Sequence, residues 1–170
     1  MRIARSVAGL TLLLTLALSP ASSLGAGTSA SVTAGGWFLF NNSIPMQFGF
    51  SAVLTPNGAQ GSFHHAYSDG TFNYEFWGTV TCMTYDAAQG RAWIGGVLTK
   101  VKSDDPDVGL AAGDDAWFRV LDSEDGDRST SMGFVGVIGS SAEYCALQIW
   151  PAGNARTHPV TNGQITLNVH

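Results

Sequence analysis

The stretch FNYEFWGTVTCMTYDAAQGRAWIGGVL, residues 72–98, decides the fold of this chain. Its side chains alternate between two faces, which is the period of two expected of half-buried β-strands. The connection at residues 86–90 is short and ends in glycine, as hairpin loops commonly do. The stretch therefore predicts a β-hairpin. The face assigned to the core carries Phe72, Tyr74, Phe76, Gly78, Val80 and Cys82 in the first arm and Ala92, Ile94, Gly96 and Leu98 in the second.

Short alternating or apolar runs continue on both sides of this hairpin, and no segment shows a convincing 3.6-residue apolar period. About nine strands are expected, so we predict an all-β domain. Apolar strands at both ends favour an antiparallel barrel of about eight to nine strands whose first and last strands pair, because closure removes exposed edges. A two-sheet β-sandwich is the alternative. The remaining predicted strands lie at residues 37–40, 46–54, 61–67, 116–121, 132–138, 143–150 and 165–169.

Residues 1–26 have the pattern of a secretory signal peptide. Arg2 and Arg5 precede an apolar run at residues 7–18, and small residues lead to an expected cleavage after Ala26. This run is shorter than the roughly 20 residues of a membrane-spanning helix. We therefore expect a secreted protein, or a periplasmic one if the source has an outer membrane, with no membrane insertion after signal removal. Residues 27–36 are predicted to be a flexible N-terminal lead-in, and residues 37–170 a single β domain.

The charge balance bears on the partners of the mature chain. Loss of Arg2 and Arg5 with the signal peptide leaves six basic against 13 acidic residues, which changes the formal charge from −5 to −7. Binding to nucleic acid depends on clustered Lys and Arg. Apart from Lys100 and Lys102, the basic residues lie apart in the sequence. Nucleic acid is therefore not an expected partner.

Cys82 and Cys145 are the two cysteines of the chain. An oxidising compartment favours a disulfide between them, with a pair of buried free thiols as the alternative. Both are assigned to the core face of alternating strands. Closing a loop of this length stabilises a fold by roughly 4 kcal/mol in the chain-entropy model. Neither cysteine has the cationic or helix-terminal setting of a reactive thiolate.

His64 and His65 are adjacent, so in a strand they face opposite ways and cannot both bind one metal ion. We therefore expect one exposed and one partly buried histidine. The histidines also lack the spacing of a zinc site. The sequence also has no nucleophile elbow, phosphate-binding glycine loop or dinucleotide fingerprint. No catalytic, cofactor-binding or metal-binding residue is assigned.

Acidic residues crowd into two loops that flank the predicted strand at 116–121. We expect them to be solvated carboxylates that keep an exported protein soluble. If the loops converge at one end of the barrel, calcium is a weak alternative, although residues 122–127 depart from the EF-hand pattern. The acidic residues concerned are Asp104, Asp105, Asp107, Asp114, Asp115, Asp122, Glu124, Asp125 and Asp127.

The chain is rich in aromatic residues, with five Trp, nine Phe and four Tyr. Trp77 and Trp93 lie on the face opposite the predicted core, on facing arms of the hairpin. Such a pair commonly stabilises the sheet. Exposed side by side, the two rings would instead form an apolar platform for a sugar ring, a peptide or a protein. The sequence thus leaves open a surface contact with a protein or a carbohydrate.

The segments FWGTVTC (76–82), RAWIGGVLT (91–99) and FRVLDSEDGD (118–127) together resemble a pattern of small exported bacterial β-proteins of no known function. Those proteins show a G-x-V-x-C strand, an A-x-I-G-G-V strand and a V-x-D strand end before an acidic loop. The resemblance implies an intact β domain and a bacterial source. It brings no catalytic residue, and this chain departs from the pattern in the long loop 103–114.

Three functions follow from the sequence. The first is a secreted non-enzymatic β domain that binds, or packs against, something at or outside the cell surface. The second is a lipocalin-like carrier of a small ligand, which ranks lower because inward aromatic residues argue for a filled core. The third is an enzyme on a barrel scaffold, by analogy of fold alone. The inward residues are Phe48, Phe50, Phe72, Tyr74 and Phe76.

Overall fold

The computed structural model of the chain describes residues 29–134 and 138–170. Within them the strands are β1 (Ala30–Phe40), β2 (Ile44–Thr55), β3 (Gly58–Ser68), β4 (Asn73–Asp86), β5 (Arg91–Ser103), β6 (Asp115–Leu121), β7 (Arg128–Ser129), β8 (Gly133–Phe134) and β9 (His158–Val169). The helical segments are α1 (Ser141–Leu147) and the 3₁₀ turns η1 (Ala87–Gln89) and η2 (Ala152–Asn154). The signal-peptide prediction for residues 1–26 lies outside this range.

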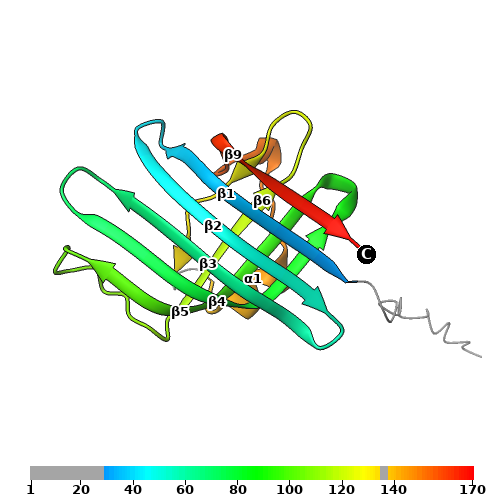
Figure 1. Cartoon of the computed structure of the whole chain (residues 1–170), viewed down its shortest axis with the longest axis horizontal. Helices are drawn as coiled ribbons and strands as arrows, with labels where there is room; N and C mark the ends of the chain where they lie inside the picture. The colour runs from blue at the N-terminus through cyan, green and yellow to red at the C-terminus, as the bar shows by residue number, and fades with distance from the viewer. Residues whose placement is uncertain (1–28, 135–137) are drawn as a thin grey trace, which may run out of the picture.

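The described strands form one antiparallel sheet that closes into a barrel (Figure 1). Eight of these strands make the ring, in the order β1-β2-β3-β4-β5-β6-β7-β9, and β9 pairs with β1. The ninth, β8, pairs with β6 as an additional strand. The prediction of an all-β antiparallel barrel with paired first and last strands is confirmed, and the sandwich alternative is not adopted.

Strands β1 to β5 form what we call the wall: long neighbours of 11 to 14 residues joined by successive hairpins. Their inner faces carry much of the core, as the alternation predicts, and large rings pack beside glycines. A Cβ atom on Gly78 would lie 2.0 Å from the ring of Phe63, so this glycine makes room for a core phenylalanine. Buried residues of the wall include Phe38, Phe48, Phe50, Phe63, Tyr74, Phe76, Val80, Ile94 and Leu98.

One part of the hairpin prediction is wrong. The register between β4 and β5 shifts between Val80 and Cys82, so Thr81 has no partner residue on β5. An extra residue of this kind is a β-bulge and reverses the alternation beyond it. As a result Met83 joins the core cluster, whereas Cys82 lies on the outer face beside Ser141 of α1.

The segment 143–150, predicted as a strand, is not one, because residues 141–147 form helix α1. The Ser140 side chain caps the helix by accepting a hydrogen bond from the backbone N–H of Glu143, and the Glu143 carboxylate accepts one from the N–H of Gly139. The helix packs on the outer face of β4, β5 and β6. The predicted Cys82–Cys145 disulfide is present and joins α1 to β4, with the two Cα atoms 6.2 Å apart. It therefore crosses the outside of the barrel and not its core.

The flexible lead-in predicted at 27–36 is also wrong from Ala30 onward, where β1 begins. Ala30 and Val32 are fully buried, and β1 pairs with both β2 and β9. Figure 1 shows β1 between β2 and β9. The small residues of this segment resemble a linker in composition. In the barrel Ala30 and Val32 take inner positions of β1, and Ala34 pairs with Phe50 of β2 and Ile165 of β9.

The barrel closes through a second region, which we call the seam: the side where β6 faces β9 across β7, β8 and the loop 122–127. Strand β7 is two residues long and pairs with β9 only at His158 and Pro159. Farther along β9, carboxylates replace a partner strand. Asp127 accepts a hydrogen bond from the Ile165 N–H at 2.6 Å, and Asp122 accepts one from the Leu167 N–H at 2.8 Å. The seam thus depends on side-chain acceptors where the wall has paired strands.

Candidate functional site

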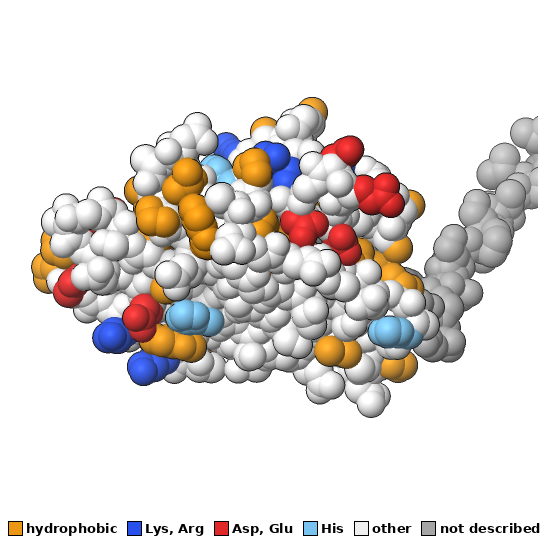
Figure 2. Space-filling view, turned by 45° about the horizontal axis from the view of Figure 1, so that its top comes forward, with side chains coloured by type: hydrophobic (Ala, Val, Ile, Leu, Met, Phe, Trp, Pro, Cys, Tyr) orange, Lys and Arg blue, Asp and Glu red, His pale blue; other side chains and the backbone are white. Residues whose placement is uncertain are grey.

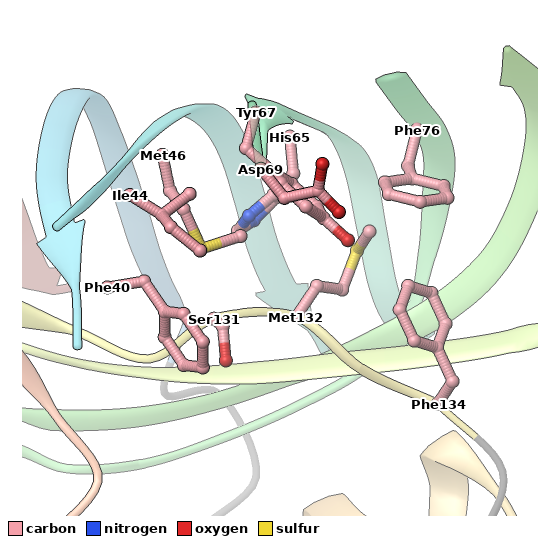
Figure 3. Close-up of a pocket in the computed structure, with 10 residues that line it drawn as sticks. All are labelled: Phe40, Ile44, Met46, His65, Tyr67, Asp69, Phe76, Ser131, Met132 and Phe134. Atoms are coloured by element: carbon pink, nitrogen blue, oxygen red, sulfur yellow. The ribbon is translucent and has the colours of Figure 1, made fainter. Parts of the chain in front are cut away.

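A cavity of about 300 Å³ lies where one end of the wall meets the seam. Its wall side comes from the inner faces of β2, β3 and β4 and from the end of β1. Its seam side comes from residues 131–134. Figure 3 shows these side chains converging from both sides. The cavity is lined by Phe40, Ile44, Met46, His65, Tyr67, Asp69, Phe76, Ser131, Met132 and Phe134.

His65 is fully buried at the inner end of this cavity. In the sheet it pairs with Phe48 and Phe76, and its ring lies 5.0 Å from that of Phe118. Neither imidazole nitrogen has a hydrogen-bond partner in the part of the chain that the structure describes. A buried polar group without a partner costs about 1–3 kcal/mol, and most such groups in proteins are satisfied. His65 is therefore the polar feature of the cavity that needs explanation.

Burial holds His65 in its neutral form. The loss of solvation, with a smaller contribution from nearby His64, lowers the pKa of His65 to about 3. A neutral imidazole carries one N–H donor and one nitrogen acceptor. The wall of the cavity thus holds an uncharged donor and an uncharged acceptor, both covered by neighbouring side chains in this conformation.

The rim of the cavity is linked by ring stacking and hydrogen bonds, and it carries the carboxylate of Asp69. The Tyr67 ring stacks on that of Tyr74 at 4.6 Å, and the Tyr74 hydroxyl donates to Asp105 at 2.8 Å. This hydrogen bond raises the pKa of Tyr74 above its usual value, and burial followed by the charge of Asp69 raises that of Tyr67. Asp69 accepts hydrogen bonds from two backbone N–H groups, chiefly that of Phe72, which lower its pKa. Asp69 is therefore ionised at neutral pH.

Among its described lining residues the cavity has a negative group, Asp69, and no positively charged Lys or Arg. The other ionisable residues of this described lining are His65 and Tyr67. Ser131 also lines the cavity, but it makes no hydrogen bond to His65 within the described ranges. A nucleophile activated by a base would need such a bond.

His64 lies on the opposite face of β3, as the alternation predicts. Its ring stacks on that of Trp77 at 5.0 Å, and the Lys100 ammonium lies 4.5 Å from the centre of the Trp77 ring. The two tryptophans do not pair, so both the expected cross-strand pair and the alternative of an exposed platform are wrong. Trp77 is opposite Lys100, whereas Trp93 is opposite Thr84 and is buried near α1 and the Trp150 ring.

The acidic loops do not converge, because they lie at opposite ends of β6. Figure 2 shows acidic side chains in separate groups on the face it presents. Several carboxylates bind backbone N–H groups. Besides those of the seam, Asp114 accepts from Ala111 and Asp115 from Ser141. Within residues 29–134 and 138–170, no group of three or more His, Cys, Asp or Glu could hold a metal ion. Calcium binding stays a prediction from sequence.

The described residues include no helix with the length and apolar character needed to cross a membrane. Comparison of the chain with protein-family models, curated proteins and solved structures found no match in any of the three. The resemblance to small exported bacterial β-proteins therefore stays a prediction. The described residues form an eight-stranded antiparallel barrel with one extra strand and a cavity at its mouth.

Sequence reasoning missed His65 as a site residue. The signal was available, because His65 falls between Phe63 and Tyr67 on the inward face of its strand. A polar residue in an apolar row predicts a buried hydrogen-bonding group. The cavity beside it could not be predicted, because residues 131–134 come from a distant part of the chain.

Proposed function

We propose that this protein is exported and binds a small, largely apolar molecule in the barrel-mouth cavity. The lipocalin-like carrier thus becomes the leading function. A carrier of this kind is a particular case of the more general expectation, a non-enzymatic binding domain at or outside the cell surface. The observation that carries the proposal is His65, a fully buried side chain in the cavity wall whose two nitrogens lack partners among the described residues.

The lining supports this function. Small-molecule sites are mostly apolar with a few convergent polar groups, and they occur at the mouths of β-barrels. The rings of Phe40, Phe76 and Phe134 and the side chains of Met46 and Met132 supply apolar contact, and methionine adapts its shape to irregular ligands. The inward phenylalanines fill most of the barrel, as predicted, but leave this end open to a ligand.

The volume sets the size of the ligand. About 300 Å³ is at the lower end of the range for ligand pockets. It is roughly twice the volume of an engineered cavity, on the order of 150 Å³, that binds benzene. The site therefore suits a molecule of one to two rings.

Export is supported by two features. Residues 1–26 have the pattern of a signal peptide. The Cys82–Cys145 disulfide suits an oxidising compartment. Of the cleavage positions that the sequence allows, after Ala26 as first choice and after Ser23 or Ala30 as alternatives, the full burial of Ala30 in β1 disfavours the last.

The experiment is a binding titration with naphthalene, followed by its fluorescence, on the native chain and two variants. Ser131→Trp puts a large side chain at a residue that lines the cavity, and Ser51→Trp places the same side chain on the exposed outer position of β2. We expect the native chain and Ser51→Trp to bind alike, and Ser131→Trp to bind at least tenfold more weakly. Thermal melts establish that both variants are folded. No binding by the native chain, or equal binding by both variants, contradicts the proposal.

A further inference from the structure

The surroundings of His65 leave one direction for a hydrogen-bonding partner. Phe48 and Phe76 lie beside it in the sheet, and Phe118 faces its ring from β6. These rings offer no hydrogen-bond acceptor of ordinary strength. On the cavity side stand the thioethers of Met46 and Met132, which are weak acceptors. Figure 3 shows an imidazole nitrogen of His65 among the side chains that line the cavity. His65 has no exposed surface in this conformation, so a partner in the cavity reaches its nitrogens when a flexible methionine side chain, Met46 or Met132, shifts aside.

The charge of the site decides what kind of group that partner is. A carboxylate beside His65 would lose its hydration, because the histidine is neutral and the described lining contains no Lys or Arg. Burying an unpaired carboxylate is far more costly than burying a hydroxyl that finds a partner. The ionised Asp69 at the rim adds repulsion of the same sign. Long-chain acids are thereby disfavoured both by charge and by the small volume.

We infer that the cavity selects an uncharged, compact molecule of about ten to fifteen carbon atoms whose hydroxyl or carbonyl group hydrogen-bonds to His65. A hydroxyl can donate to the acceptor nitrogen or accept from the N–H, and a carbonyl can accept from the N–H. The ring system of the ligand lies among the phenylalanines and methionines of the lining. This inference rests on the proposed function and adds the chemical class of its ligand.

Three probes with one skeleton test it at pH 7: naphthalene, 2-naphthol and 2-naphthoate. On the native chain we expect 2-naphthol to bind about three- to tenfold more tightly than naphthalene, as one net hydrogen bond allows, and at least tenfold more tightly than 2-naphthoate. In His65→Phe the advantage of 2-naphthol over naphthalene is lost, because the ring is kept without its nitrogens. His64→Phe is the matched control, since its side chain lies on the outer face of the same strand, and it keeps the native order.

A second measurement does not depend on a variant that folds. The imidazole ¹⁵N resonances of His65 in the native chain are expected to shift when 2-naphthol is added, and to respond much less to naphthalene. His65→Gln, which keeps a donor and an acceptor, is expected to retain part of the preference for 2-naphthol.

The outcomes separate the two proposals. If naphthalene fails to bind the native chain, the proposed function fails, and this inference fails with it. If naphthalene binds but 2-naphthol gains nothing, if 2-naphthoate binds best, or if His65→Phe keeps the native preference, the inference is overturned while the cavity remains a binding site.

Discussion

The wall and the seam build one barrel by different means. In the wall, strands of 11 to 14 residues pair with both neighbours along most of their length, and phenylalanines fill the inner face. In the seam, β7 and β8 have two residues each, and the carboxylates of Asp122 and Asp127 bind the N–H groups of β9. The cavity lies where the two regions meet. The comparison teaches that space for a ligand arises where long paired strands give way to short strands and side-chain acceptors.

The largest expected effect compares one phenylalanine from each region. Phe38→Ala removes a fully buried ring of the wall that packs on Phe48, and we expect it to lower the free energy of unfolding by about 3–5 kcal/mol. Phe134→Ala removes a half-buried ring of the seam that contacts Phe76, and we expect a loss of about 1–2 kcal/mol. Chemical denaturation of both variants measures the difference. Equal losses would mean that a ring of the seam contributes as much to stability as a ring of the wall.

The disulfide ties the segment that follows the seam to the outer face of the wall. Replacing both Cys82 and Cys145 by alanine is expected to lower the free energy of unfolding by roughly 2–4 kcal/mol, because the unfolded chain loses a 63-residue constraint. The strand signal in circular dichroism should persist, since the wall does not contain the cross-link. Hydrogen exchange should become faster at Tyr144 of α1 and stay slow in β2. Loss of the strand signal would show that the wall needs this cross-link.

The buried histidine predicts a dependence of stability on pH. The pKa of His65 is about 3 in the folded chain and near 6.5 in the unfolded one, so between these values the unfolded state binds one more proton. The stability contributed by neutral His65 is therefore fully present above pH 6.5. Below that, the free energy of unfolding falls by roughly 1.4 kcal/mol per pH unit as the pH drops toward 3. At pH 4.5 the expected loss is roughly 3 kcal/mol. Asp69, whose pKa is lowered, adds a loss of the same sign at low pH.

Unfolding curves of the native chain and His65→Gln at several pH values measure this contribution, because the aspartate contribution is common to both and cancels. The native chain should lose more stability than the variant between pH 6.5 and 4.5. Parallel losses would mean that His65 takes up its proton without unfolding the barrel.

The smallest expected effect concerns the acceptors of the seam. Asp127 accepts hydrogen bonds from the N–H groups of Ser123 and Ile165. Asp127→Asn keeps one acceptor oxygen, and we expect a loss of about 1–2 kcal/mol, with faster hydrogen exchange at Ile165. Asp107→Asn, in the exposed loop after β5, is the control with little expected effect. If both substitutions act alike, the carboxylates do not hold the seam.

Local patterns predicted much of the wall. The alternation in residues 72–80 and 92–98 identified the inner faces of β4 and β5, and apolar strands at both ends indicated closure of the barrel. The facing directions of His64 and His65 followed from the same period. These features could be predicted because the direction of a side chain in a strand follows from its place in the local sequence.

The seam and the cavity depend on contacts between distant residues. Nothing local marks Thr81 as a bulge, so the outward direction of Cys82 could not be predicted. Helix α1 has seven residues, too few to display a helical period, and its apolar residues alternate well enough to suggest a strand. Residues 131–134 line the cavity because of how the chain crosses the barrel mouth after β7.

The carboxylates of Asp122 and Asp127 also affect how this all-β protein avoids self-association. A strand with free N–H groups along one side is a template for pairing with another molecule. On β9 the N–H groups of Ile165 and Leu167 already have acceptors that carry negative charge. An incoming strand would have to displace both charges before it could extend the sheet, so the weakest side of the barrel carries its own protection against aggregation.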